Sequence, residues 1–366
     1  MGWSAEDIEK KLLKGRLDSL ALSHKNVVSA FNRVEKLLGP EWIKSETSAT
    51  GLFSVMGVTG MGLRLTAVEG VAEADKLIKR IRDGDRSAEA ELTAVYLLRS
   101  YGPSVELQVQ PSVGQRKADF RVQNGSGQWT TVEVTQPNAS KENERVTEIL
   151  QTLTGALREA HRQFALEVVF RREPAEEELT LLCQRLAEFC ELQGQQQADL
   201  SDGLGFLFLN QIPIGHLLKR KIVGLADTPM IGLAMFVGGG PGGGPHHQVH
   251  VRIPFTDHRA EEILRDEARQ LPQDEPGLVM IDVASSSGAF ESWSALIKRR
   301  FQPTIHTRIS GVCLFEGAGV PTEKGYDWLL RTLLVTNPYA RFPLPAWIQS
   351  AVTSAGKEFE RISSSW

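Results

Sequence analysis

Cysteine is scarce in this sequence, and long apolar runs are absent. Three cysteines in 366 residues cannot form the disulfide framework of a small secreted domain. There is no run of about 18 apolar residues, so the sequence predicts no membrane-spanning helix. Residues 1–15 also lack the apolar segment of a secretory signal peptide. These absences predict a soluble, cytoplasmic protein with no membrane partner.

An excess of positive charge is also missing. Lysine and arginine total 41 against 45 aspartate and glutamate residues, which leaves a formal net charge of −4. Any contact with nucleic acid must therefore come from local basic clusters rather than from a general positive field. Hydrophobic residues make up 41% of the chain, enough for a buried core, so the composition excludes a mainly disordered chain.

Helical periodicity dominates the first 100 residues. Apolar residues recur there at three- and four-residue steps, which is typical of helices with one buried face. The predicted helices cover 5–38, 68–82 and 88–100. Residues 45–63 are rich in Ser, Thr and Gly and predict a linker or a short irregular strand region, and Ser87 is the expected N-cap of the third helix. We divide the chain into a helical N-terminal extension, 1–84, and an α/β domain, 85–366.

From residue 105 onward, predicted strands alternate with predicted helices. The strands are expected at 105–109, 118–122, 129–135, 165–170, 205–209, 232–237, 248–253, 278–283 and 311–315. The helices are expected at 140–164, 175–193, 260–271 and 293–300. This alternation predicts a mixed α/β (α+β) fold with a central mixed sheet flanked by helices.

The third predicted helix carries an acid on its apolar face. Ala88, Leu92, Val95 and Leu98 form one stripe, and Glu91 falls on the same side of the helix. A carboxylate that faces a core is costly unless it is paired or binds a cation. Glu91 is therefore a candidate functional residue, and the alternative is an ordinary half-exposed helix position.

Two further acids lie on the hairpin that follows. Apolar and polar residues alternate in both of its strands, which places Asp119 and Glu133 on the polar face. Folding about the turn 124–127 brings the two acids nearly opposite each other. Such carboxylates repel each other unless a hard cation such as Mg²⁺ lies between them. The alternative is that Lys117 or Arg121 relieves the repulsion.

This order of acids resembles the core of the PD-(D/E)XK, or restriction-endonuclease-like, nuclease superfamily. Glu91 matches its helix glutamate, and Asp119 and Glu133 match its two metal-binding strand acids. The resemblance covers residues 85–140 and, more loosely, the later strands. It implies a restriction-endonuclease-like core in which these three side chains bind one or two Mg²⁺ (or Mn²⁺) ions. It also implies a metal-activated water that hydrolyses a phosphodiester bond of nucleic acid, with DNA as the first expectation.

The sequence departs from the superfamily at one catalytic position. Where the superfamily has its lysine, this chain has Thr135, followed by Gln136. Threonine lacks the positive charge that holds or activates the attacking water. Lys117, two residues before Asp119 on the same face, is a candidate substitute, and Thr135 or Gln136 could instead orient the water. A third alternative is that the fold has kept only a binding role.

Short basic clusters are the expected contacts to phosphate groups. The candidate nucleic-acid-binding residues are Lys219, Arg220, Lys221, Lys298, Arg299 and Arg300. A further cluster, Lys79-Arg80-Ile81-Arg82, lies just before the helix of Glu91. The alternative for each cluster is a solvated surface with no partner.

The sequence thus predicts a Mg²⁺-dependent nuclease, with two alternatives. One is a catalytically inactive nuclease-like fold that binds nucleic acid or a protein through the same sheet. The other is a metal hydrolase built on His246, His247, His250 and His258, although no cysteine and no HExxH helix accompanies these histidines. The sequence leaves the oligomeric state open.

Overall fold

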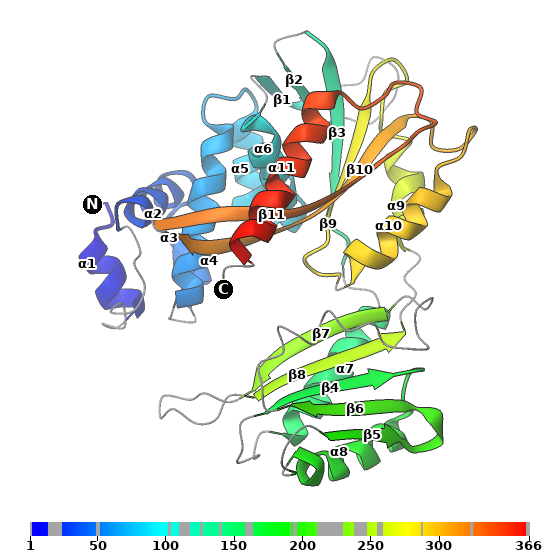
Figure 1. Cartoon of the computed structure of the whole chain (residues 1–366). Coiled ribbons are helices and arrows are strands. Elements are labelled where there is room, and N and C mark those ends of the chain that lie inside the picture. The colour runs from blue at the N-terminus through cyan, green and yellow to red at the C-terminus, as the bar shows by residue number, and fades with distance from the viewer. Residues whose placement is uncertain are drawn as a thin grey trace. The chain divides into compact units, whose positions relative to one another are not determined.

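The fold is mixed α/β, as predicted, and divides into two compact units, each with its own sheet (Figure 1). The computed structural model describes residues 2–13, 24–48, 52–101, 104–109, 118–124, 127–138, 141–157, 164–190, 192, 196–210, 230–237, 247–254, 259–286, 288–322 and 325–363. The first unit comprises Met1–Pro137, Ala260–Ser285 and Leu296–Trp366, and the second comprises Asn138–Arg259 and Ser286–Ala295.

Most helices of the first unit come from the N-terminal part of the chain. They are α1 (Ala5–Ile8), a π-helical turn (Glu9–Leu13), α2 (His24–Leu38), α3 (Pro40–Glu46), α4 (Leu52–Arg64), a 3₁₀ turn (Leu65–Val68), α5 (Ala74–Arg82) and α6 (Arg86–Arg99), followed much later by α9 (Arg259–Glu267) and α11 (Ala346–Ser363). The expectation of a linker or strand over 45–63 was wrong, because α4 occupies most of that segment. Glycine usually weakens a helix. In α4, however, Gly60 packs directly on Trp328 and Gly62 on Ala30, so the lack of a side chain at these two positions allows close packing.

The first unit contains a six-stranded sheet in the order β1-β2-β3-β9-β10-β11. Its strands are β1 (Ser104–Val109), β2 (Ala118–Gln123), β3 (Trp129–Thr135), β9 (Gly277–Asp282), β10 (Ile309–Thr322) and β11 (Gly325–Thr336). β3, β9 and β10 are parallel, and the other pairings are antiparallel. One hydrophobic core joins α2–α6 and α11 to this sheet. Helices before residue 84 and strands after it share that core, so the two units do not divide at our sequence-based boundary.

The second unit is inserted in the sequence between two neighbouring strands of the first sheet, β3 and β9. Its five strands lie in the order β5-β6-β4-β8-β7, with β4 and β8 parallel. They are β4 (Ala165–Phe170), β5 (Gln196–Leu200), β6 (Gly205–Asn210), β7 (Met230–Val237) and β8 (His247–Pro254), and the accompanying helices are α7 (Lys141–Ala156), α8 (Glu176–Cys190), a 3₁₀ turn (Ser201–Gly203) and the first part of α10 (Ala289–Arg300). Apolar residues of α7 and α8 pack with β4, β6 and β8 to form a separate core.

None of the helices in the described ranges is both long enough and apolar enough to span a membrane. The three cysteines are free; Cys190 and Cys313 are buried and Cys183 is half-buried. For the described residues, these findings agree with the expectation from the sequence of no membrane-spanning helix and no disulfide framework.

A tight turn joins α5 to α6 and brings the ends of the two helices together. Gly84 has a φ of +85°, in the left-handed region that glycine adopts without strain. The carboxylate of Asp85 caps α6 by accepting hydrogen bonds from the backbone N–H groups of Ser87 (2.9 Å) and Ala88 (3.4 Å). The N-cap is therefore Asp85 rather than Ser87, and the helix begins at Arg86.

Candidate functional site

Glu91 is buried on the core-facing side of α6, with an exposed fraction of 1%. Arg80 of α5 donates a hydrogen bond from Nη1 to Glu91 Oε2 at 2.6 Å, whereas Glu91 Oε1 is buried with no hydrogen-bond partner. Burial, and next the negative charge of Asp119, raise the pKa of Glu91 to about 8, although Arg80 opposes the shift. The sequence placed this acid on the apolar face correctly.

Asp119 and Glu133 lie opposite each other on β2 and β3. Phe120 pairs with Val132, and the next step in this antiparallel register pairs Asp119 with Glu133. Asp119 Oδ2 accepts a hydrogen bond from the backbone N–H of Val134 at 2.7 Å, so the aspartate reaches across to β3. The predicted juxtaposition of the two strand acids is present in the structure.

Burial raises the pKa of both of these carboxyl groups. Glu133 is 2% exposed, and burial together with the charge of Asp119 raises its pKa to about 10. Burial also raises the pKa of Asp119, although the N–H of Val134 favours its charged form. Asp119 acts on the carboxyl group of Glu133, whose Oε1 atom is buried with no hydrogen-bond partner. The pair therefore holds less negative charge at neutral pH than two separate carboxylates would.

Asp119 is the acid that acts on both of the others. Its charge raises the pKa of Glu91 and of Glu133, and Glu267 of α9 also raises that of Glu133. Within the described ranges, no group of three or more His, Cys, Asp or Glu side chains is arranged to hold a metal ion. Arg80 takes up one oxygen of Glu91, so the three acids are near one another without forming a ready metal centre.

The end of β3 places two more predicted residues beside a neighbouring strand. Thr135 and Gln136 are half-buried there. Gln136 Nε2 lies 3.5 Å from Oδ2 of Asp282, the last residue of β9, and Gln136 Oε1 is buried with no partner. Burial raises the pKa of Asp282. Our sequence analysis missed Asp282, although the carboxyl end of a buried strand is a common position for functional residues.

Arg80 is the other residue whose position at the site was not foreseen. The sequence assigned it only to a basic cluster, whereas the structure places it between two acids, with Nε 2.8 Å from Asp85 Oδ2 and Nη1 against Glu91. Partial burial alone would lower the pKa of Arg80, but the charges of Glu91 and Asp85 raise it. The signal in the sequence was the turn 83–85, which reverses the chain between Arg80 and Glu91.

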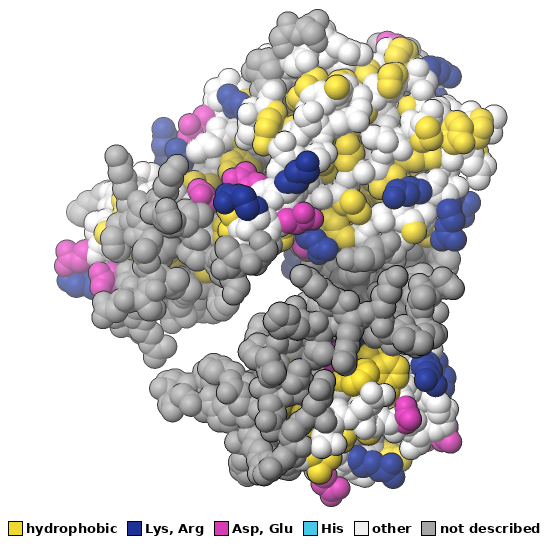
Figure 2. Space-filling model, in the orientation of Figure 1, with side chains coloured by type: hydrophobic (Ala, Val, Ile, Leu, Met, Phe, Trp, Pro, Cys, Tyr) yellow, Lys and Arg dark blue, Asp and Glu magenta, His cyan; other side chains and the backbone are white. Residues whose placement is uncertain are grey.

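The structure does not bring the described basic cluster to the acids. Lys298, Arg299 and Arg300 are exposed in the last turn of α10, and Arg300 pairs with Glu261. That turn leads to the amino end of β10, and β3, β9 and β10 run parallel to one another. Thr135 lies at the carboxyl end of β3, which is the opposite edge of the sheet. On the face in Figure 2, the coloured Lys and Arg side chains are scattered among acids rather than joined in one field. Lys117 and Lys219–Lys221 lie outside the described residues.

Few of the histidines in the alternative metal site lie among the residues that the structure describes. His246 and His258 lie outside the described ranges, as does the side chain of His247, and His250 is half-buried on β8. Burial and the charge of Arg252 lower the pKa of His250.

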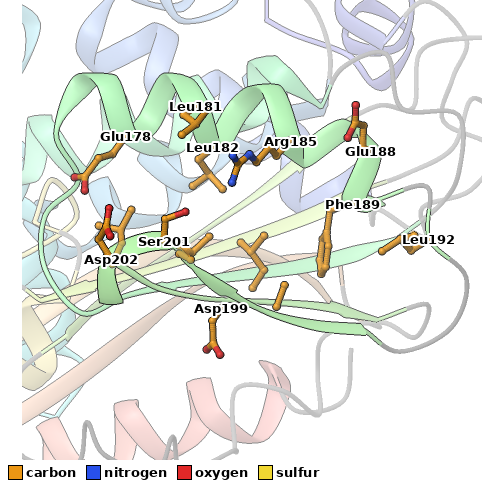
Figure 3. Close-up of a pocket in the computed structure, with 14 residues that line it drawn as sticks. Glu178, Leu181, Leu182, Arg185, Glu188, Phe189, Leu192, Asp199, Ser201 and Asp202 are labelled. Atoms are coloured by element: carbon orange, nitrogen blue, oxygen red, sulfur yellow. The ribbon is translucent and has the colours of Figure 1, made fainter.

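A hollow of about 520 Å³ lies in the second unit between α8 and β5 (Figure 3). Leu182, Phe189 and Leu207 contribute to its largely apolar lining, and Arg185 of α8 lies among them. None of the predicted site residues lines it. The hollow is thus a feature of the inserted unit and no part of the acidic site.

Comparison with known proteins adds no relative. No family model matches the chain, and neither a curated protein nor a solved structure matches it.

Proposed function

We propose that this protein is a metal-dependent nuclease, a divergent member of the PD-(D/E)XK superfamily that hydrolyses phosphodiester bonds of nucleic acid. The observation that carries the proposal is that Glu91 and Glu133 are buried and Asp119 is half-buried, close enough for Asp119 to raise the pKa of both glutamates. Burying such acids near one another is costly unless protonation or a cation offsets their repulsion.

The donor atoms at this site suit a hard divalent cation. Glu91 Oε1 and Glu133 Oε1 are buried oxygens without hydrogen-bond partners, and Asp119 lies opposite Glu133. Oxygen ligands of this kind are those that Mg²⁺ and Mn²⁺ prefer. Glu91, Asp119 and Glu133 would hold the ion. When bound, the ion would lower the pKa of a water molecule and polarise the phosphodiester group.

The residues around the acids would position the water and the substrate. The half-buried Thr135 and Gln136, at the end of β3, can orient a water molecule by hydrogen bonding. Gln136 is itself directed by Asp282, and its orphaned Oε1 is an acceptor available to that water. In the reaction the water oxygen bonds to phosphorus, the bond from phosphorus to the sugar oxygen breaks, and that oxygen takes up a proton.

The test is cleavage of plasmid DNA, single-stranded DNA and RNA in Mg²⁺, Mn²⁺ or EDTA. We expect metal-dependent cleavage that falls at least about a hundredfold in Asp119→Asn and in Glu133→Gln. Glu106→Gln is the matched control, because Glu106 is an exposed acid of the same sheet, paired with Arg121 at 2.6 Å. Wild-type protein that cleaves none of these substrates would contradict the proposal.

The second candidate is a catalytically inactive binding module. Two observations favour it. Thr135, at the position of the catalytic lysine, has no charge, and Glu91 already forms an ion pair with Arg80. The same assay separates the two functions, since a binding module would retain nucleic acid in a salt-sensitive way, with or without EDTA, and would leave it intact. Bound zinc that survives both acid substitutions would instead favour the histidine site.

A further inference from the structure

We infer that Arg80 supplies at this site the positive charge that the superfamily takes from its strand lysine. In this inference, which rests on the proposed nuclease function, Arg80 is the counter-ion of Glu91 in the free protein. It turns its terminal guanidinium nitrogens to the phosphate of the substrate when Glu91 binds a cation. Arg80 is thereby a phosphate-binding residue, and the substrate group that it recognises is a phosphodiester.

The position of Arg80 gives it access to both the acids and solvent. Its side chain is 35% exposed, whereas that of its partner Glu91 is 2% exposed. Arg80 also acts on Asp119, whose negative charge it favours. Among the described residues, no other lysine or arginine forms an ion pair with Glu91, Asp119 or Glu133. A substrate phosphate that reaches these acids from solvent would therefore meet Arg80 there.

The contacts of Asp85 divide the guanidinium into a fixed and an exchangeable part. Asp85 Oδ1 caps α6, and Asp85 Oδ2 holds Nε of Arg80 at 2.8 Å. Because the cap anchors the carboxylate, Nε stays in place while Nη1 can leave Glu91. Arginine has five donors in a planar fork and can serve two anions at once, whereas lysine has a single ammonium group and cannot reproduce this arrangement.

Electrostatic interactions would drive the change of partner of Arg80 from Glu91 to a phosphate. With a cation held by Glu91, the guanidinium of Arg80 would be repelled from that carboxylate, and a phosphodiester oxygen would offer it a new anionic partner. As the water oxygen bonds to phosphorus and the bond to the sugar oxygen breaks, negative charge on the non-bridging oxygens must be stabilised. A guanidinium held at one end by Asp85 is already oriented for that task.

Arg80→Ala and Arg80→Lys test the inference, with Lys76→Ala as the control. Lys76 lies one turn earlier on α5, is exposed, and pairs with Glu73, so its removal changes the net charge equally without touching the acids. Three quantities are measured: the affinity for Mg²⁺ alone by calorimetry, retention of a duplex oligonucleotide in Ca²⁺, and cleavage in Mg²⁺.

We expect Arg80→Ala to bind Mg²⁺ about tenfold more tightly, because a like charge is removed from Glu91. We also expect it to bind the oligonucleotide about tenfold more weakly and to cleave about a hundredfold more slowly. Arg80→Lys, which keeps a charge and protects the fold, should fall between Arg80→Ala and the wild type in all three measurements.

The outcomes separate this inference from the proposed function. Wild-type cleavage with Arg80→Ala indistinguishable from Lys76→Ala would overturn the role of Arg80 and leave the nuclease in place. Loss of cleavage in Arg80→Ala with weaker Mg²⁺ binding would also overturn it, because Arg80 would then be only a structural support of Glu91. A wild-type protein that neither binds Mg²⁺ nor cleaves would overturn both.

Discussion

Replacing Glu133 by glutamine should make the metal-free protein more stable at neutral pH. In the unfolded chain Glu133 ionises near its ordinary pKa of 4.5, whereas in the folded protein burial and Asp119 raise the pKa to about 10. Between these values the unfolded chain binds fewer protons than the folded one, so the free energy of unfolding falls as the pH rises. By pH 7 the loss amounts to roughly 3 kcal/mol, at about 1.4 kcal/mol per pH unit.

Glutamine avoids this loss and keeps the shape of the side chain. Its amide can donate a hydrogen bond to Asp119, which lies opposite it on β2. We expect Glu133→Gln to match the wild type at pH 4 and to exceed it at pH 7 by up to roughly 3 kcal/mol. A part of this gain belongs to Asp119, because the two groups titrate together.

Hydrogen exchange in EDTA over a series of urea concentrations measures the effect in each unit separately. Peptides that cover 129–135 report on the first sheet, and peptides that cover 165–170 report on the second and serve as the internal control. A wild-type protein whose first unit is equally stable at pH 5 and pH 7 would refute the reasoning. The same holds for a Glu133→Gln variant that gains nothing between these pH values.

Three further predictions follow from the site and its supports. Mg²⁺ at ten times its dissociation constant should stabilise the first unit of the wild type by about 1.4 kcal/mol at pH 7, but not that of Asp119→Asn; equal stabilisation of both would place the ion elsewhere. Gly84→Ala should destabilise by about 1 kcal/mol in urea unfolding, because the φ of +85° strains other residues; an unchanged midpoint would be contrary evidence. Leu92→Ala, at a fully buried position of α6, should destabilise by about 2–5 kcal/mol, and a loss below 1 kcal/mol would mean that the core closes around the gap.

The hairpin and its acids could be predicted because local rules determine them. Alternation assigns each residue of a strand to a face, and a short turn fixes which residues lie opposite each other. The pairing of Phe120 with Val132 follows from these two facts, and it sets Asp119 opposite Glu133. The helical position of Glu91 was equally accessible, since a single stripe of apolar residues identifies the buried face.

Elements that depend on distant partners could not be predicted. In 325–336 the leucines recur at three- and four-residue steps, as in a helix, yet the segment forms β11 because it pairs with β10 along its whole length. α11 and β5 were missed, and Arg80 was not connected with Glu91, eleven residues away on another helix. The spacing of three or four residues identifies neighbouring side chains on one helix, but it does not identify contacts between two helices joined by a turn.

The balance of charge at the site argues for a cation more strongly than the sequence motif does. Arg80 pairs with Glu91 and Asp85, and its charge also acts on Asp119. A purely structural role would be met at lower cost by apolar residues of similar volume, because the attraction within a buried ion pair seldom exceeds the desolvation of its charges. At Asp119 and Glu133 burial favours the protonated forms, and no basic side chain in the described ranges forms an ion pair with either acid. A divalent ion at that point would replace the proton. If Arg80 has the role proposed above, the positive charge for the phosphate would come from α5 rather than from position 135.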